Sequence, residues 1–108
     1  MAFKLTMRPD LPDYEMDLPL DGETFTLRFR WSAREAAHYM DVYDQDGERV
    51  AAGLKVVLGR KLGLRRIGRG MPAGALIAVD TARRGQAPGE TDLGDRVQVY
   101  YLEADELG

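Results

Sequence analysis

The chain has 108 residues, of which 44% are hydrophobic and 31% are charged, and its formal net charge is −3 at pH 7. This length suits one folded domain over residues 1–108, and this composition excludes the low-hydrophobicity class of disordered proteins. Because the sequence contains no cysteine, it excludes disulfide bonds, thiolate nucleophiles and cysteine-ligated metal sites.

Two strands joined by a tight turn are expected after an extended N-terminal arm over residues 1–12. Apolar and polar residues alternate from Tyr14 to Leu20, which is the pattern of a strand with one buried face. Asp21-Gly22 follows, a dipeptide that accepts the positive φ angles of a hairpin turn. The next strand, from Thr24 to Trp31, also alternates. Its apolar face consists of Phe25, Leu27, Phe29 and Trp31.

A second hairpin is expected around Asp46-Gly47. Residues 32–35 permit at most one helical turn before the strand-like composition resumes. Tyr39 and Tyr43 on that strand are interpreted as core residues, so Asp41 on the same face needs an arginine or a turn amide as its partner. The return strand covers residues 50–58, and Gly53 within it predicts a bulge or a close backbone approach.

Residues 59–74 are predicted to form a glycine-rich basic loop with one short helical piece at most. Five cations occur there without an acidic residue: Arg60, Lys61, Arg65, Arg66 and Arg69. Because like charges repel unless something separates them, three interpretations stay open: a solvated loop, an interface with an acidic protein, and a nucleic-acid contact. The net negative charge and the lack of interleaved exposed aromatic residues disfavour nucleic acid.

Two further strands complete the predicted fold. Residues 75–79 are apolar at every position, which is typical of a strand covered on both faces. Residues 83–91 are polar and rich in turn formers, and residues 96–102 form the final strand. The pattern therefore predicts an all-β, mainly antiparallel domain, a small barrel or sandwich of about six strands with at most one short helix.

No catalytic, metal or nucleotide motif is complete. His38 and Ser32 are the only histidine and serine, but their spacing does not suggest a catalytic triad, and His38 is interpreted as a structural residue. Residues 44–47 look like part of a calcium loop, yet Val42 and Gly53 stand where ligands are required. Residues 68–74 have one residue too many for a dinucleotide fingerprint and precede a strand. We therefore expect a protein that is not an enzyme and that needs no cofactor or metal.

The order of several short motifs carries a resemblance to a known family. The motifs are Trp31, Tyr39-Met40-Asp41-Val42-Tyr43-Asp44, Asp46-Gly47, Gly53, Leu58-Gly59, Gly68, Gly74-Ala75-Leu76, Asp80, Pro88, Leu93-Gly94-Asp95-Arg96-Val97 and Tyr100. In this order they resemble the phage baseplate plug family, which comprises small proteins of tailed-phage tails. The resemblance runs from about Leu18 to the C-terminus, nearly the whole chain.

The resemblance implies a β fold and a structural, non-enzymatic role in the virion. By this resemblance, the protein is expected to pack where the tail tube meets the hub and to help close and assemble the tail. The implied partners are the baseplate hub and the tube or tube-initiating protein, and the implied location is the tail after assembly in the host cytoplasm. Exposed edge strands make a homo-oligomer in the baseplate ring a further expectation.

The alternative function is a small β-barrel module that holds nucleic acid with the basic segment from Arg60 to Arg69. A membrane location is not expected from the sequence. No stretch approaches the ~20 apolar residues of a membrane-spanning helix, and the first residues lack the apolar core of a signal peptide.

Overall fold

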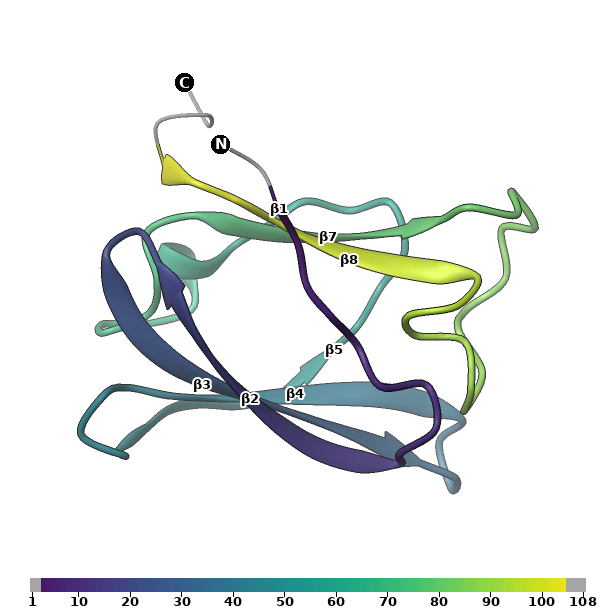
Figure 1. Cartoon of the computed structure of the whole chain (residues 1–108), viewed down its shortest axis with the longest axis horizontal. Helices are drawn as coiled ribbons and strands as arrows, with labels where there is room; N and C mark the ends of the chain where they lie inside the picture. The colour runs from purple at the N-terminus through teal and green to yellow at the C-terminus, as the bar shows by residue number, and fades with distance from the viewer. Residues whose placement is uncertain (1–2, 105–108) are drawn as a thin grey trace.

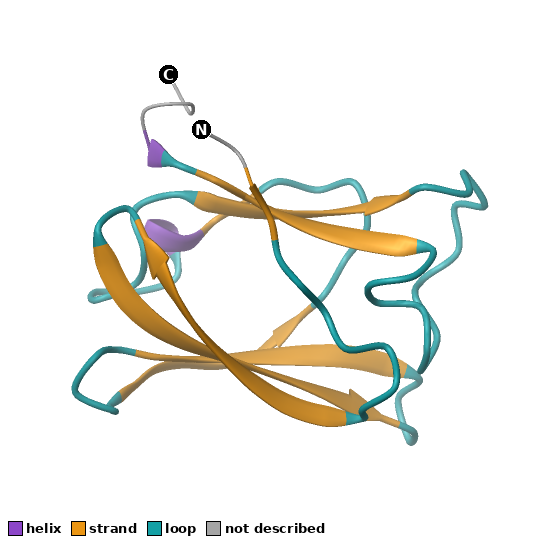
Figure 2. Cartoon of the chain, viewed as in Figure 1, coloured by secondary structure: helices purple, strands orange, loops and turns teal. Residues whose placement is uncertain are grey.

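The computed structural model describes residues 3–104. Its strands form two four-stranded antiparallel sheets that face each other (Figures 1 and 2). The first sheet has the order β2 (Asp13–Leu20), β3 (Glu23–Ser32), β4 (Ala37–Tyr43) and β5 (Arg49–Lys55). The second sheet has the order β1 (Phe3–Lys4), β8 (Val97–Leu102), β7 (Ala75–Asp80) and β6 (Leu62–Gly63).

The predicted fold class is confirmed, and the arrangement is a sandwich rather than a closed barrel. The described residues contain eight strands where about six were expected. The two additional strands, β1 and β6, have two residues each, which is too short for an alternating pattern to be seen. One 3-10 helix, η1 (Leu64–Arg66), lies within the predicted basic loop. Residues 33–36 form turns, not a helix.

Both predicted hairpin turns are present. Leu20 pairs with Glu23, so Asp21 and Gly22 alone connect β2 to β3, with φ angles of 54° and 83°. Such a pair of positive φ angles matches the twist of the flanking strands. Between β4 and β5, the Asp44 carboxylate accepts hydrogen bonds from the amides of Asp46 and Glu48 at 2.9 and 3.0 Å. The first turn is therefore stabilised by the backbone conformation of its own residues, and the second by hydrogen bonds from backbone amides to the Asp44 side chain.

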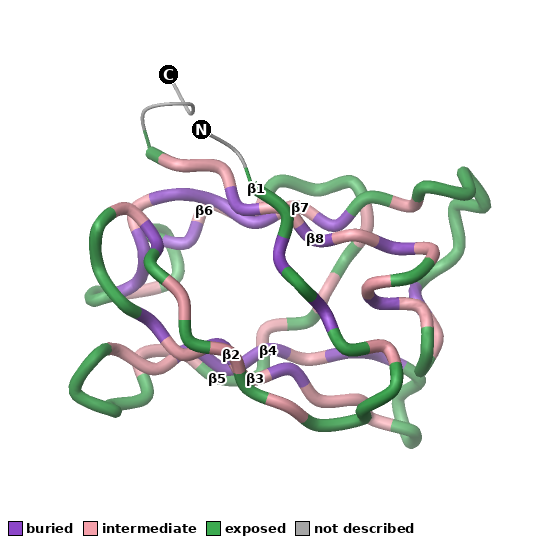
Figure 3. Tube along the Cα trace, in the orientation of Figure 1, coloured by how far each residue is buried: buried purple, intermediate pink, exposed green. Residues whose placement is uncertain are grey.

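The core lies between the two sheets, as the buried segments show in Figure 3. The register pairs Phe29 with Met40 and Leu27 with Val42, so these four residues face the core. The interpretation of Tyr39 and Tyr43 as core residues is therefore wrong. These tyrosines occupy the outer face and are half-buried, because adjacent residues of a strand point to opposite faces.

The expectation that residues 75–79 are covered on both faces is also wrong. Ala75, Leu76 and Ala78 are buried, but Ile77 is half-buried and Val79 is 39% exposed. Strand β7 therefore has one face in the core and presents apolar side chains on the other.

The N-terminal arm closes one open side of the sandwich. Its described part, residues 3–12, begins beside β8 and crosses to the first sheet (Figure 1). Leu5 and Met7 are buried, and the Leu5 amide donates a hydrogen bond to the Val99 carbonyl at 2.8 Å. At the other end, the Trp31 amide donates to the Pro12 carbonyl at 2.8 Å. The arm is thus extended and integrated into the core.

Candidate docking surface

The basic loop is anchored to the sandwich at several points. Leu58 forms a parallel bridge with Ala78, and β6 pairs with the start of β7. Leu64 and Met71 are fully buried, which attaches both sides of η1 to the core. The loop backbone is consequently held in place while its charged side chains face outward.

All five predicted interface cations are exposed. Arg65 donates a hydrogen bond from Nε to the Met71 carbonyl at 2.9 Å, which supports the loop from within. Among residues 3–104, none of the five forms an ion pair with an acidic side chain. They do not form one compact cluster. Arg60 and Lys61 lie along β7, and Arg65 and Arg66 belong to η1. Arg69 precedes Gly70, where an added Cβ atom would lie 3.2 Å from the Val50 side chain of β5.

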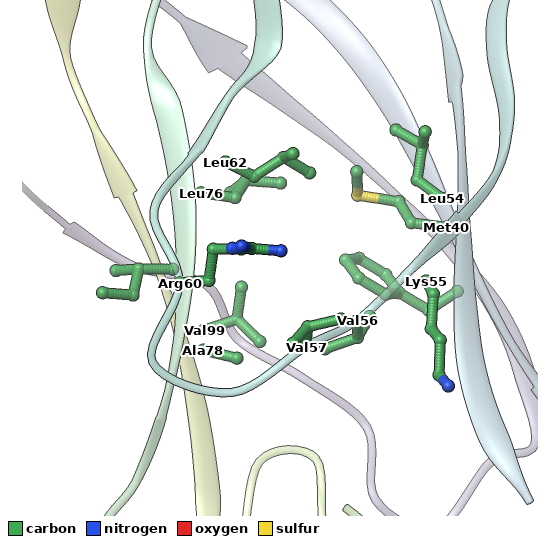
Figure 4. A pocket seen from close by; sticks show the side chains of 12 residues that line it. Met40, Leu54, Lys55, Val56, Val57, Arg60, Leu62, Leu76, Ala78 and Val99 are labelled. Atoms are coloured by element: carbon green, nitrogen blue, oxygen red, sulfur yellow. The ribbon is translucent and has the colours of Figure 1, made fainter. Parts of the chain in front are cut away.

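An apolar cavity of about 170 Å³ opens beside the first part of this loop (Figure 4). Its walls come from both sheets and from the segment that follows β5. Its lining consists of Phe29, Met40, Leu54, Lys55, Val56, Val57, Arg60, Leu62, Leu76, Ile77, Ala78 and Val99. The Arg60 side chain points into the cavity, whereas the Lys55 ammonium points away from it. The sequence predicted Arg60 as a loop cation but gave no sign of the cavity that it enters.

The buried carboxylate predicted at Asp41 has the two kinds of partner that were expected. It is 4% exposed on the outer face of β4, where Arg30 donates from Nε at 3.1 Å and the Gly53 amide donates at 2.8 Å. Burial by itself raises the pKa of Asp41, but these hydrogen bonds and the Arg30 charge bring it below its ordinary value. Gly53 has a φ of 70° beside a register irregularity, so the predicted bulge is confirmed.

His38 also has a structural environment. It is 4% exposed, and its ring lies 4.8 Å from that of Trp31, centroid to centroid. Its Nε2 is 2.7 Å from the Gly89 carbonyl, so this nitrogen carries the proton and donates. Burial lowers the pKa of His38, which favours the neutral ring. The residue connects β4 to the loop before β8.

Within the described ranges, no group of three or more histidine or acidic side chains is placed to hold a metal ion. In the same part of the chain, no helix has the length and apolar character needed to cross a membrane.

Comparison with known protein families identifies the chain. Residues 2–105 match the family described as the cyanophage Pam3 baseplate plug gp18. The chain belongs to this baseplate plug family. The resemblance found in the short motifs is thereby confirmed over nearly the whole chain. A search of curated proteins finds no match.

The structure explains the motif from Leu93 to Val97, which is one of the motifs that resemble the plug family. Its arginine, Arg96, is 9% exposed at the side chain and donates to the carboxylates of Asp80 and Asp92 at 2.8 and 3.1 Å. The same guanidinium donates to the carbonyls of Gln86 and Ala87 at 3.2 and 3.1 Å. Arg96 therefore holds the long loop after β7 in place. Sequence reasoning missed this role, although the motif contained the residue.

Asp80 completes this network from the end of β7. Its carboxylate accepts hydrogen bonds from the amides of Ala82, Arg84 and Gly85. Burial by itself raises the pKa of Asp80, but these amides and the Arg96 charge lower it overall. In this member of the plug family, the loop that follows β7 is organised around the ion pairs of Arg96 with Asp80 and Asp92.

Proposed function

We propose that this protein is a non-enzymatic structural component of a phage tail baseplate, where it packs at the junction of tail tube and hub and helps to close and assemble the tail. The match of residues 2–105 to the baseplate plug family carries this proposal.

The basic loop is the proposed contact with an acidic surface of the hub or the tube-initiating protein. Five exposed cations that have no acidic partner among residues 3–104 leave their charge available to a neighbour. Most of them are arginines, whose planar guanidinium suits paired carboxylates. Because Leu64 and Met71 anchor the loop, little conformational freedom has to be lost when a partner binds.

A charge-reversal experiment tests this contact. Arg66→Glu combined with Arg69→Glu changes two exposed cations and leaves the Arg65 hydrogen bond to Met71 intact. We expect the double variant to fold normally but to be missing from tail particles when it replaces the wild-type protein. Immunoblotting of purified particles, with circular dichroism of the isolated variant, measures both properties.

Arg34→Glu combined with Arg49→Glu is the matched control, because both arginines are exposed and lie outside the loop. This control should be incorporated like the wild type. Normal incorporation of the Arg66/Arg69 variant, or equal loss of both double variants, would contradict docking through the basic loop.

A further inference from the structure

The cavity beside Arg60 has the dimensions of an anchor pocket. Its volume is about 170 Å³, whereas sites for small-molecule ligands usually have about 300–1,000 Å³. An apolar cavity of roughly 150 Å³ in another protein accommodates one benzene ring. The space therefore suits a single apolar side chain, and it is too small for a cofactor.

The walls of the cavity favour an apolar occupant. Met40 and Leu54 project from the first sheet, and Leu76, Ala78 and Val99 project from the second (Figure 4). A water molecule there would find few of the polar partners that stabilise buried water. Val57 at the cavity is 49% exposed, so an apolar group from outside would cover a residue that is now in contact with solvent.

Arg60 brings a positive charge to this apolar site, which favours an occupant that carries a negative charge. Its side chain points into the cavity, and among residues 3–104 its guanidinium has no ion pair and no hydrogen bond (Figure 4). A carboxylate beside the bound apolar group would supply both, because a guanidinium binds carboxylates with two parallel hydrogen bonds. The other cation of the lining, Lys55, directs its ammonium away.

We propose that the cavity receives one apolar side chain of a neighbouring baseplate protein, and that Arg60 binds a carboxylate adjacent to that side chain. This inference rests on the proposed function, since it specifies how the docked partner is held. Interfaces concentrate their binding energy in a few anchors that fill pockets. The cavity supplies the apolar part of such an anchor, and Arg60 supplies its charge specificity.

The test uses the isolated full chain and three small probes. N-acetyl-leucinate carries both the apolar side chain and the carboxylate, N-acetyl-leucinamide lacks the charge, and N-acetylglycinate lacks the side chain. Methyl NMR signals of Leu54, Val56 and Val99 report on occupancy of the cavity. We expect N-acetyl-leucinate to bind about two- to five-fold more tightly than the amide, the range for a solvent-exposed ion pair. N-acetylglycinate should leave these signals unchanged.

Two arginine variants distinguish the effect of Arg60 at the cavity from the effect of the overall positive charge of the loop. Arg60→Met removes the cation that enters the cavity, and it should abolish the preference for the carboxylate. Arg66→Met makes the same change in η1, and it should leave the preference unchanged. Equal binding of the two leucine probes to the wild type would overturn the proposal. So would an equal loss of preference in the two variants.

Ala78→Leu fills part of the cavity from β7 and should prevent binding of both leucine probes. Shifts of the same methyl signals by these probes in a folded Ala78→Leu variant would place binding outside the cavity and overturn the proposal. If this variant does not fold, the comparison of Arg60→Met with Arg66→Met decides. The probe experiments do not involve tail particles, so their outcome is independent of the incorporation test of the basic loop.

Discussion

The hydroxyl of Tyr101 donates a hydrogen bond to the carboxylate of Asp21 and thereby connects the two sheets. Tyr101 is fully buried on β8, and Asp21 belongs to the turn between β2 and β3. The same hydroxyl accepts a hydrogen bond from the Gly74 amide at 2.9 Å. Burial and the neighbouring carboxylate raise the pKa of Tyr101, so the phenol stays protonated. One hydroxyl thus joins the first hairpin to the end of the basic loop.

Tyr101→Phe should destabilise the fold by about 1–3 kcal/mol, because it leaves the Gly74 amide without its acceptor in a buried position. Urea unfolding monitored by tryptophan fluorescence measures this change. Tyr100→Phe is the control, since Tyr100 is half-buried on the opposite face of β8. An equal loss of stability in the two variants would show that the hydroxyl contact has no special role.

Gly74→Ala should be among the most damaging single substitutions. A Cβ atom at this position would lie 2.1 Å from the Leu102 carbonyl oxygen and 2.6 Å from Cζ of Tyr101. Neither a backbone atom nor a packed ring can move away easily, so we expect a loss of about 3 kcal/mol or more. Thermal unfolding provides the measurement.

Gly68→Ala is the matched control for Gly74→Ala. A Cβ atom at position 68 meets no atom within 4 Å, so the expected change stays within about 0.5 kcal/mol. Similar melting temperatures for the two variants would contradict the close approach of β8 to Gly74.

Arg96→Lys should loosen the loop after β7, although it keeps the positive charge. A lysine ammonium cannot reproduce the fork that reaches Asp80, Asp92 and two carbonyl groups together. We expect a lower melting temperature and faster amide hydrogen exchange over residues 81–95. The exposed Arg84→Ala variant should show neither effect, and wild-type exchange rates in Arg96→Lys would refute the proposed role.

Stability should fall when the solution is acidified from about pH 7 to about pH 5. Burial lowers the pKa of His38 from its ordinary value of 6.5. Below that value the unfolded chain therefore binds a proton that the folded chain does not, and the free energy of unfolding decreases until the pH passes the folded pKa. The lowered pKa values of Asp41, Asp80 and Asp92 reduce stability only as the pH falls below about 5, so the window from pH 7 to pH 5 reports on the histidine.

His38→Gln removes this titration and keeps a donor for the Gly89 carbonyl. Melting temperatures measured across the same pH range should change less for His38→Gln than for the wild type. Parallel pH profiles of the two proteins would exclude His38 as the cause.

Structural features that depend only on residues adjacent in the chain can be predicted from the sequence. The turns at Asp21-Gly22 and Asp46-Gly47, and the bulge at Gly53, follow from the backbone preferences of these residues. The strand from Thr24 to Trp31 was recognisable because its two faces differ in polarity. The plug family was also indicated by the linear order of short motifs, which the family match confirms.

The sequence by itself could not assign the faces of β4, because both alternating sets of its residues are largely apolar or aromatic. Pairing with β3 decided that Met40 and Val42 face the core and that Asp41 meets Arg30. The cavity at Arg60 has the same origin, since its walls come from strands of both sheets. Local patterns determine turns and strands, whereas contacts between residues distant in the chain exist only once the two sheets are packed together. The tertiary structure therefore decided that the Asp41 carboxylate is buried, that Arg30 is its partner, and that the Arg60 side chain faces an open apolar cavity.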